Sequence, residues 1–393
     1  ERITMKLCEK IASLGTETAF QTLAKAQALE AKGVKVFHLE IGEPDFDTPQ
    51  NIRNSAIFAL ENGYTNYCNS QGLPELRCEI AAQIERTRHV SVDPDCVIIT
   101  PGAKPIMFYT MLALLEDGDE AIFPDPGFPI YESVINYTGA KPVPIPLREE
   151  LDFRLDVEEL ESKITPHTKL IILNSPHNPT GGVLTVNDIR FIADLAHKHD
   201  ITIISDEIYH HITYEEESYS ITSLPGMLER TILIDGFSKA YAMTGWRLGY
   251  GIVPPYLVDP IVRLIINSVS CTPAFIQQAG IEALTGPQDS LGRMVNEFRS
   301  RRDFIVERLN EIPGFSCRKP NGAFYVFPNI KEFDMDSQKL ADYFLNVAGV
   351  ATLAGASFGT FGEGYLRLSY ATSKENIKAA LEMLNKAAVD LLN

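Results

Sequence analysis

The stretch TILIDGFSKAYAMTGWRLGYGI, residues 231–252, sets a lysine between two apolar segments. Residues 231–235 and 247–252 are each predicted to form a short buried strand. Lys239 follows the first strand, and a lysine among apolar and aromatic neighbours loses its charge easily and can condense with an aldehyde. A solvated surface lysine is the alternative interpretation. The stretch therefore predicts a buried sheet with a candidate reactive amine at its edge.

Short apolar segments of the same kind recur upstream, and helical patterns separate them. The segments are CVIIT (96–100), EAIF (120–123), KLIIL (169–173) and ITIIS (201–205). Strands that alternate with helices are typical of α/β domains, in which helices cover both faces of a mostly parallel sheet. The pattern therefore predicts an α/β fold whose large domain spans residues 44–284.

The C-terminal part of the chain has a different pattern. Residues 285–393 combine long charged helical segments with few short strands, which predicts a smaller α+β domain. Residues 1–43 are expected to join this smaller domain. A cleft between two such domains is a usual place for a ligand.

The expected elements follow from apolar periodicity and from turn residues. Further strands are expected at residues 34–41, 323–327 and 365–370. Helices are expected at residues 17–32, 50–62, 73–89, 105–116, 129–138, 185–199, 287–311, 336–348 and 373–391.

The composition narrows the class of protein. The chain has 393 residues, 45% of them hydrophobic and 22% charged, which is the balance of a globular enzyme. The net charge of −17 disfavours binding to nucleic acid and to anionic membranes. The six cysteines are scattered without a CxxC pair, so neither a disulfide framework nor a metal site is expected. Without a membrane-length apolar run or a signal peptide, a cytoplasmic location is expected.

Several polar residues follow predicted strands, where open α/β sheets bind their ligands. Asp206 follows ITIIS directly, and its carboxylate suits a protonated pyridine nitrogen; a helix N-cap is the alternative. Tyr209 in SDEIY and Asn178 in NSPHNPTGG offer hydrogen-bond donors to the same ligand. Their alternative interpretations are a packing tyrosine and a turn-forming asparagine.

A phosphate site is predicted where residues 102–104 open a helix. A glycine turn before a helix exposes backbone N–H groups, which bind phosphate, although many strand–helix connections look alike. Arg247 lies in GWRLGY, and an arginine between apolar residues needs an anionic partner. That partner is either a cofactor phosphate or a carboxylate of the protein.

Longer motifs show a resemblance to a known family. SKAYAMTGWRLGY (238–250), NSPHNPTG (174–181), SDEIY (205–209) and RLSYA (367–371) occur in this order, together with IGEPDFDTP (41–49) and YCNSQGLPELR (67–77). The chain resembles the fold-type I pyridoxal-phosphate enzymes, specifically class I aminotransferases of the prokaryotic aspartate-aminotransferase branch. The resemblance covers nearly the whole chain.

The resemblance implies a role for each matching residue. Lys239 would bind pyridoxal 5'-phosphate covalently and act as the general base, and Asp206 would pair with the pyridine nitrogen. Arg367 would bind the substrate α-carboxylate, a planar group that arginine suits. The remaining assignments are Tyr209 and Asn178 to the ring oxygen, Gly102, Ala103, Ser238 and Arg247 to the phosphate, Gly42 and Asn174 to the substrate, and Tyr67 to the phosphate of the neighbouring subunit in a homodimer.

Two positions bear on the choice of substrate. Phe128 in DPGFPIY takes the place of the ring-covering tryptophan that is frequent in this family; it can stack but lacks the indole donor. Lys104 matches a lysine that, in part of this branch, helps to bind the distal carboxylate of aspartate or glutamate. A solvated loop lysine is the alternative, and Phe128 weakens the case for dicarboxylic substrates.

The expected reaction is ping-pong transfer of an amino group from an L-amino acid, aspartate-like or broader, to a 2-oxo acid such as 2-oxoglutarate. A pyridoxal-phosphate lyase, cyclising synthase or oxidative enzyme on the same scaffold is the first alternative, because a fold does not fix the reaction. A nicotinamide oxidoreductase is excluded, since no G-x-G-x-x-G follows a strand and opens a helix. A non-catalytic binding module would be expected to lack Lys239 or Asp206.

Overall fold

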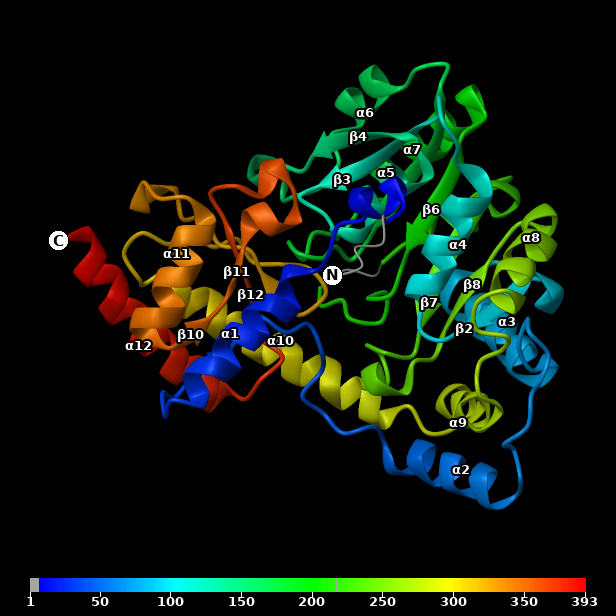
Figure 1. Cartoon of the computed structure of the whole chain (residues 1–393), viewed down its shortest axis with the longest axis horizontal. Helices are drawn as coiled ribbons and strands as arrows, with labels where there is room; N and C mark the ends of the chain where they lie inside the picture. The colour runs from blue at the N-terminus through cyan, green and yellow to red at the C-terminus, as the bar shows by residue number, and fades with distance from the viewer. Residues whose placement is uncertain (1–6, 216–217) are drawn as a thin grey trace, which may run out of the picture.

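A seven-stranded sheet forms the centre of the larger unit of the computed structural model, which describes residues 7–215 and 218–393 (Figure 1). In spatial order its strands are β2 (Val97–Thr100), β8 (Gly249–Ile252), β7 (Thr231–Gly236), β6 (Thr202–Asp206), β5 (Thr168–Asn174), β3 (Glu120–Asp125) and β4 (Lys141–Pro146). The strands from β7 to β4 run parallel, and β8 is antiparallel to both of its neighbours. The predicted α/β fold with a mostly parallel sheet is confirmed.

Helices cover both faces of this sheet, because successive side chains of a strand point to opposite faces. Leu170 and Ile172 of β5 pack on one side, and Ile171 and Leu173 on the other. The first face carries α4 (Lys104–Leu114), α5 (Ile130–Thr138) and α8 (Pro255–Ile266). The second carries α2 (Gln50–Glu61), α3 (Pro74–Arg88), α6 (Val157–Lys163), α7 (Val186–His199) and α9 (Ala274–Thr285). No helix in the described part of the chain has the length and apolar character of a membrane span.

A smaller unit lies beside the sheet, at the left of Figure 1. Its antiparallel strands are β11 (Leu353–Ala354), β12 (Leu366–Ser369) and β9 (Tyr325–Val326), in that spatial order. Its main helices are α10 (Asp289–Leu309), α11 (Ser337–Tyr343) and α12 (Lys374–Leu392). The N-terminal segment adds α1 (Thr18–Glu30) and β1 (Phe37–His38), which pairs in parallel with β10 (Val350–Ala351).

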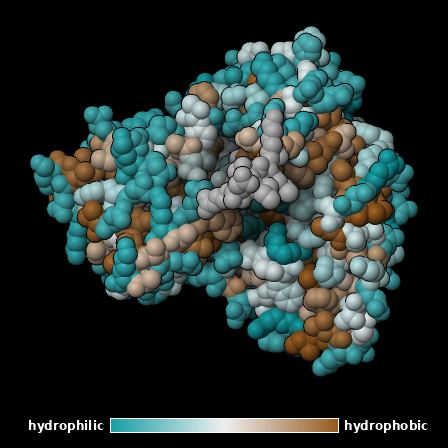
Figure 2. Space-filling model, in the orientation of Figure 1, coloured by the Kyte–Doolittle hydropathy of each residue, from teal (hydrophilic) through white to brown (hydrophobic). Residues whose placement is uncertain are grey.

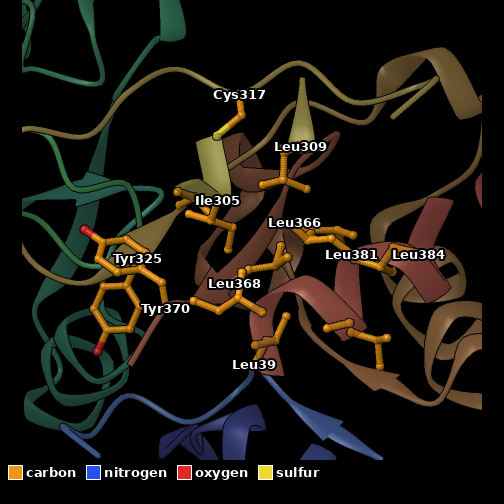
Figure 3. Close-up of a cluster of buried hydrophobic side chains, with 14 of the residues drawn as sticks. Leu39, Ile305, Leu309, Cys317, Tyr325, Leu366, Leu368, Tyr370, Leu381 and Leu384 are labelled. Atoms are coloured by element: carbon orange, nitrogen blue, oxygen red, sulfur yellow. The ribbon is translucent and has the colours of Figure 1, made fainter. Parts of the chain in front are cut away.

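One hydrophobic cluster joins the two units. Figure 3 shows its part in the smaller unit, where Leu39 of the N-terminal segment lies among residues of β12 and α12. Tyr209 and Ile212, which follow β6 of the larger unit, belong to the same cluster. The segment after β6 is therefore fixed from both sides, and this positions Tyr209.

Several boundaries differ from the sequence prediction. The strand expected at 34–41 pairs only over Phe37–His38, and the one expected at 247–252 begins at Gly249, because Arg247 has a positive φ of 55°. The helix expected at 336–348 is α-helical only to Tyr343 and continues as a π-helix. Strand β4 was not predicted, since KPVPIP is rich in proline; it lies at the sheet edge, where proline is tolerated. Helices α6, α8 and α9 were not predicted either.

A buried ion cluster joins the ends of β6 and β7. The Nε of Arg88, at the end of α3, donates to Glu207 Oε2 at 3.1 Å, and its NH2 donates to Asp235. The side chain of Arg88 is fully buried. Ser220 donates to Glu207 Oε1 at 2.6 Å, and the Tyr250 hydroxyl donates to Asp235 Oδ2 at 3.1 Å. Because Glu207 follows β6 and Asp235 lies near the end of β7, Arg88 ties the carboxyl ends of both strands together.

Replacing Arg88 with methionine is expected to lower the free energy of unfolding by about 3–5 kcal/mol, because two buried carboxylates lose their cation. Denaturant unfolding of the purified protein measures the change. Arg86→Met is the matched control, because Arg86 lies on the same helix with an exposed side chain that donates to Gln83 one turn away. Equal unfolding free energies for the two variants would show that the cluster does not hold the sheet.

Candidate active site

Lys239 lies just beyond the end of β7, with its amine inside a cavity. Its Nζ donates to the carbonyl of Gly42 at 2.5 Å, and it lies 5.9 Å from the ring centre of Tyr209 and 5.7 Å from that of Phe324. Burial, and to a lesser degree the nearby charge of Arg367, lower the pKa of Lys239 to about 8. Compared with an ordinary lysine, such an amine has a much larger neutral fraction near neutral pH, and the neutral amine is the nucleophile. The alternative of a solvated surface lysine is wrong.

Asp206 ends β6 on the face of the sheet that carries α5. Its Oδ2 accepts a hydrogen bond of 2.6 Å from the hydroxyl of Tyr131, and its Oδ1 accepts from the backbone N–H of Ile208 at 3.3 Å. Burial raises its pKa to about 6. The residues directly after Asp206 form turns and not a helix, so the N-cap alternative is wrong. The carboxylate faces a cavity without a protein cation bonded to it in the described chain.

The amide of Asn174 fixes the neighbouring loop. Its Nδ2 donates to the backbone carbonyl of Asp206 at 3.0 Å, and its Oδ1 accepts from the backbone N–H of Asn178 at 2.9 Å. Both ends of the Asn174 side chain are thus used by the main chain. Asn174 holds Asn178 against the end of β6, although the sequence suggested that it contacts the substrate.

Arg367 on β12 brings a buried guanidinium to the cavity from the smaller unit. Its NH1 donates to Asn178 Oδ1 at 3.0 Å, and its NH2 donates to the carbonyl of Glu40. Its guanidinium carbon lies 4.4 Å from the ring centre of Tyr325 and 5.0 Å from that of Phe358. Within the described residues, its Nε has no hydrogen-bond partner. Burial lowers the pKa of Arg367 from its ordinary value, because removal from water disfavours the charged guanidinium. A bound anion would stabilise this charge.

Arg247 lies beside the glycine turn that was predicted to bind phosphate. Its NH1 donates to the carbonyl of Thr244 at 2.7 Å. A Cβ added at Gly102, which has a φ of +86°, would lie 2.2 Å from the NH2 of Arg247. Only glycine therefore allows this approach of guanidinium and turn. No carboxylate of the described residues forms an ion pair with Arg247, which favours an external anion; Ala103 and Ser238 line the cavity nearby.

Lys104 begins α4, two residues after Gly102, and also lines the cavity. Its Nζ forms an ion pair with Glu17 and lies 5.3 Å from the ring centre of Phe128. Phe128 packs edge-on against Tyr131, with 5.6 Å between the ring centres. Lys104 is thus engaged with a carboxylate of the same chain, a contact that the sequence did not suggest.

Tyr67 lies apart from these residues. Its side chain is 89% exposed and takes no part in lining the cavity. Gly42 does line it, and a Cβ at this position would collide with the Tyr325 hydroxyl at 2.2 Å.

The cavity has a volume of about 590 Å³, which fits a cofactor and a small substrate. Of the residues singled out in the sequence, all line it except Gly102 and Tyr67, namely Gly42, Ala103, Lys104, Phe128, Asn174, Asn178, Asp206, Tyr209, Ser238, Lys239, Arg247 and Arg367.

The lining residues that sequence reasoning missed include Glu17, Tyr131, Tyr325 and Phe358. Tyr131 lies one helical turn beyond Phe128 in DPGFPIY, and this spacing was the signal for it. The hydroxyl of Tyr325 lies 2.7 Å from that of Tyr209, across the boundary between the units. No local pattern marks Glu17, Tyr325 or Phe358, because they reach the cavity through tertiary packing.

Comparison with known proteins places these features in a family. Residues 34–384 match the model of the family described as aminotransferase class I and II. The aspartate aminotransferase of Pyrococcus abyssi is 43% identical over 361 residues, which cover 91% of this chain and 92% of that protein. The aromatic-amino-acid aminotransferase 2 of Thermococcus litoralis is 41% identical, with the same coverage of 91% and 92%.

A solved structure agrees with these relatives. The aspartate aminotransferase from Thermus thermophilus with maleate superposes with a TM-score of 0.94 at 35% identity, over 98% of this chain and 100% of that one. The relatives favour amino-group transfer over the lyase alternative that the sequence left open. The chain belongs to the class I and II aminotransferases, which use pyridoxal phosphate to transfer amino groups.

Proposed function

We propose that this aminotransferase accepts L-amino acids with either acidic or aromatic side chains and passes the amino group to a 2-oxo acid such as 2-oxoglutarate in a ping-pong reaction. The observation that carries the proposal is the convergence of Lys239, Asp206 and Arg367 on one cavity. The relatives named for aspartate and for aromatic amino acids are 43% and 41% identical, so they do not select one substrate class.

The residues of the cavity fit pyridoxal phosphate. Asp206 is a part-buried carboxylate whose hydrogen-bond partners in the described chain are neutral, which suits a cationic ring nitrogen. Arg247 has no ion pair within the described chain and lies against the Gly102 turn, which suits a phosphate. Lys239 offers an amine with a pKa of about 8. When bound, pyridoxal phosphate supplies an aldehyde that takes up amines and a pyridine ring that accepts electrons.

The side chains divide the chemistry among them. Lys239 would remove the proton from the substrate Cα as general base and would then, as general acid, deliver a proton to the carbon that came from the cofactor aldehyde. Asp206 holds the proton on the ring nitrogen. The hydroxyl of Tyr131, bonded to Asp206 at 2.6 Å, fixes the orientation of this carboxylate.

Asn178 and Tyr209 orient the ring, and Arg367 orients the substrate. The amide oxygen of Asn178 accepts a hydrogen bond from Arg367. The amide NH2 group of Asn178 is therefore available to donate to the ring oxygen, together with the Tyr209 hydroxyl. Arg367 binds the α-carboxylate that all amino acids share, using its free Nε. A carboxylate there meets a charge that burial has already separated from water.

We also propose a homodimer whose interface includes the exposed face of α2 and the residues that follow it. Phe58, Tyr64 and Tyr67 are 64%, 40% and 89% exposed, and Ile57 and Leu60 add to the patch. The brown surface at the lower right of Figure 2 lies over α2. Exposed apolar patches of this kind mark interfaces, and a symmetric dimer would let Tyr67 reach the phosphate site of the partner.

We also propose domain boundaries and a cytoplasmic location for the protein. The pairing of β1 with β10 supports joining residues 1–43 to a small domain of residues 285–393, with residues 44–284 as the large domain. All six cysteines are free thiols, which supports a cytoplasmic location, where thiols stay reduced.

Lys239→Ala is expected to abolish the absorbance band of the bound cofactor and to reduce amino-group transfer by at least about 100-fold, because the general base is lost. Spectra of the purified protein and formation of pyridoxamine phosphate from added amino acid measure both effects. Lys198→Ala, which alters an exposed lysine on α7, is the control. A band that persists in Lys239→Ala would refute the assignment of this residue.

Lys104→Ala is expected to lower the ratio of kcat/KM for aspartate to that for phenylalanine by about tenfold, because a distal carboxylate loses its cation. A donor screen with 2-oxoglutarate as acceptor measures the ratio. Lys25→Ala removes an exposed lysine on α1 and serves as the control. Unchanged aspartate turnover in Lys104→Ala would contradict the dicarboxylate subsite.

Phe58→Asp is expected to convert a dimer into monomers, since a charge would be buried in the interface. Light scattering on a sizing column measures the mass, and Val347→Asp on the smaller unit is the control, because Val347 is also exposed.

Tyr67→Phe is expected to keep the dimer but to weaken cofactor binding about tenfold, through loss of a hydrogen bond to a charged group. A monomeric native protein would overturn the proposed shared site.

A further inference from the structure

Glu17 places a carboxylate inside the cavity, and no cofactor role accounts for it. It precedes α1 as the N-cap residue, yet its side chain makes no capping hydrogen bond. It pairs instead with Lys104 across the cavity wall. Its negative charge also acts on the pKa of Lys239 and of Arg367. The Glu17 carboxylate therefore lies within electrostatic reach of the proposed general base, Lys239, and of the proposed α-carboxylate group, Arg367.

The segment that carries Glu17 is attached to both units. Before it, the backbone N–H of Gly15 donates to the Ser133 hydroxyl on α5 at 2.8 Å. After it, Ala26 of α1 packs in a hydrophobic cluster with Val36 and Ala351 of the smaller unit. Glu17 thus lies where the chain passes from one unit to the other, beside the cavity. Its position is built by the fold and is not that of a loose N-terminal tail.

A count of cationic side chains in the cavity singles out Lys104. Among the described residues, four cations line the cavity: Lys104, Lys239, Arg247 and Arg367. Lys239, Arg247 and Arg367 are assigned to the covalent bond, the phosphate and the α-carboxylate. Of these four described cations, Lys104 remains for the substrate side chain, and Glu17 already pairs with it.

Apolar side chains lie beside this ion pair, although the Lys104 side chain is 45% exposed. Phe20 and Leu23 line the cavity on the α1 side, and the Phe128 ring lies 5.3 Å from the Lys104 amine. A neutral side chain therefore meets apolar walls and a cation that is already paired, which leaves no charge uncompensated. An acidic side chain also needs a cation, and it finds that cation occupied.

We propose that Glu17 is a specificity-determining residue that acts as an internal competitor for Lys104. Its carboxylate stays on Lys104 when a neutral or aromatic amino acid binds, and gives Lys104 up to the distal carboxylate of a dicarboxylic substrate. The exchange keeps one carboxylate on Lys104 in both cases. The side chain of Glu17 is 21% exposed, so it can turn to water when displaced. This inference rests on the proposed function and adds to it the residue that balances the two substrate classes.

Glu17→Gln in the full-length holoenzyme tests the proposal. Single-turnover half-reactions with aspartate, glutamate and phenylalanine give kcat/KM for each donor. We expect the values for aspartate and glutamate to rise about fivefold, because Lys104 no longer has a competing partner. The value for phenylalanine is expected to fall about twofold, because Lys104 is left unpaired beside an apolar side chain. Glu382→Gln, the same charge change on the exposed face of α12, is expected to leave the ratio unchanged.

A double-variant cycle separates competition from a general structural effect. In a Lys104→Ala background, Glu17→Gln is expected to have no effect on the ratio of acidic to aromatic donors, because there is nothing left to compete for. An active Glu17→Gln enzyme with the wild-type ratio would overturn the inference and leave the aminotransferase function intact. A Glu17→Gln effect that persists without Lys104 would also overturn it. If the wild type forms no pyridoxamine phosphate from any donor, the proposed function fails, and the inference with it.

Discussion

The contact between Arg88 and the two carboxylates at the ends of β6 and β7 is the constraint on which the site depends. Successive residues of a strand face opposite sides of a sheet, so Asp206 faces the cavity while Glu207 faces Arg88. The ion pair between Glu207 and Arg88 thus fixes the position of the neighbouring Asp206 carboxylate in the cavity. Asp235 does the same for β7, whose end leads to Lys239. A fully buried arginine is costly in itself, and here it fixes two strand ends that carry the chemistry.

Burial without pairing gives the cavity its electrostatic character. The pKa of Asp206 is raised to about 6 and that of Lys239 is lowered to about 8, in both cases chiefly by loss of water. The two side chains do not form an ion pair with each other in the described chain, so neither relieves the cost of the other. Arg367 shows the same condition, with an Nε that lacks a partner among the described residues. Groups held in this state are stabilised by a ligand of complementary charge, which is how the site favours its cofactor and substrate.

Sequence patterns predicted the parts of the molecule that depend on local chemistry. The central strands except β4, the Lys239 and Asp206 positions, and the glycine turn at Gly102 all follow from short apolar segments and from the residues that end them. Strand β4 could not be predicted, because its prolines are acceptable only at a sheet edge, and edge position is a property of the whole sheet. The pairing of Glu17 with Lys104 escaped prediction for a similar reason. It joins residues far apart in the chain, and neither has a local feature that selects the other.

The contacts that join the two units lie beside the proposed substrate site. Arg367 belongs to the smaller unit, yet its NH1 donates to Asn178 of the larger one at 3.0 Å. The hydroxyls of Tyr209 and Tyr325 meet across the same boundary at 2.7 Å. The proposed binding of a substrate α-carboxylate to Arg367 would therefore occur where these contacts join the units. The segment that carries Glu17 also connects the units, so a distal carboxylate that displaces Glu17 from Lys104 acts on a second connection. Under the proposed competition, acidic substrates would engage both connections and neutral ones only the first. The difference in binding free energy between the two classes would then include the work of altering the second connection.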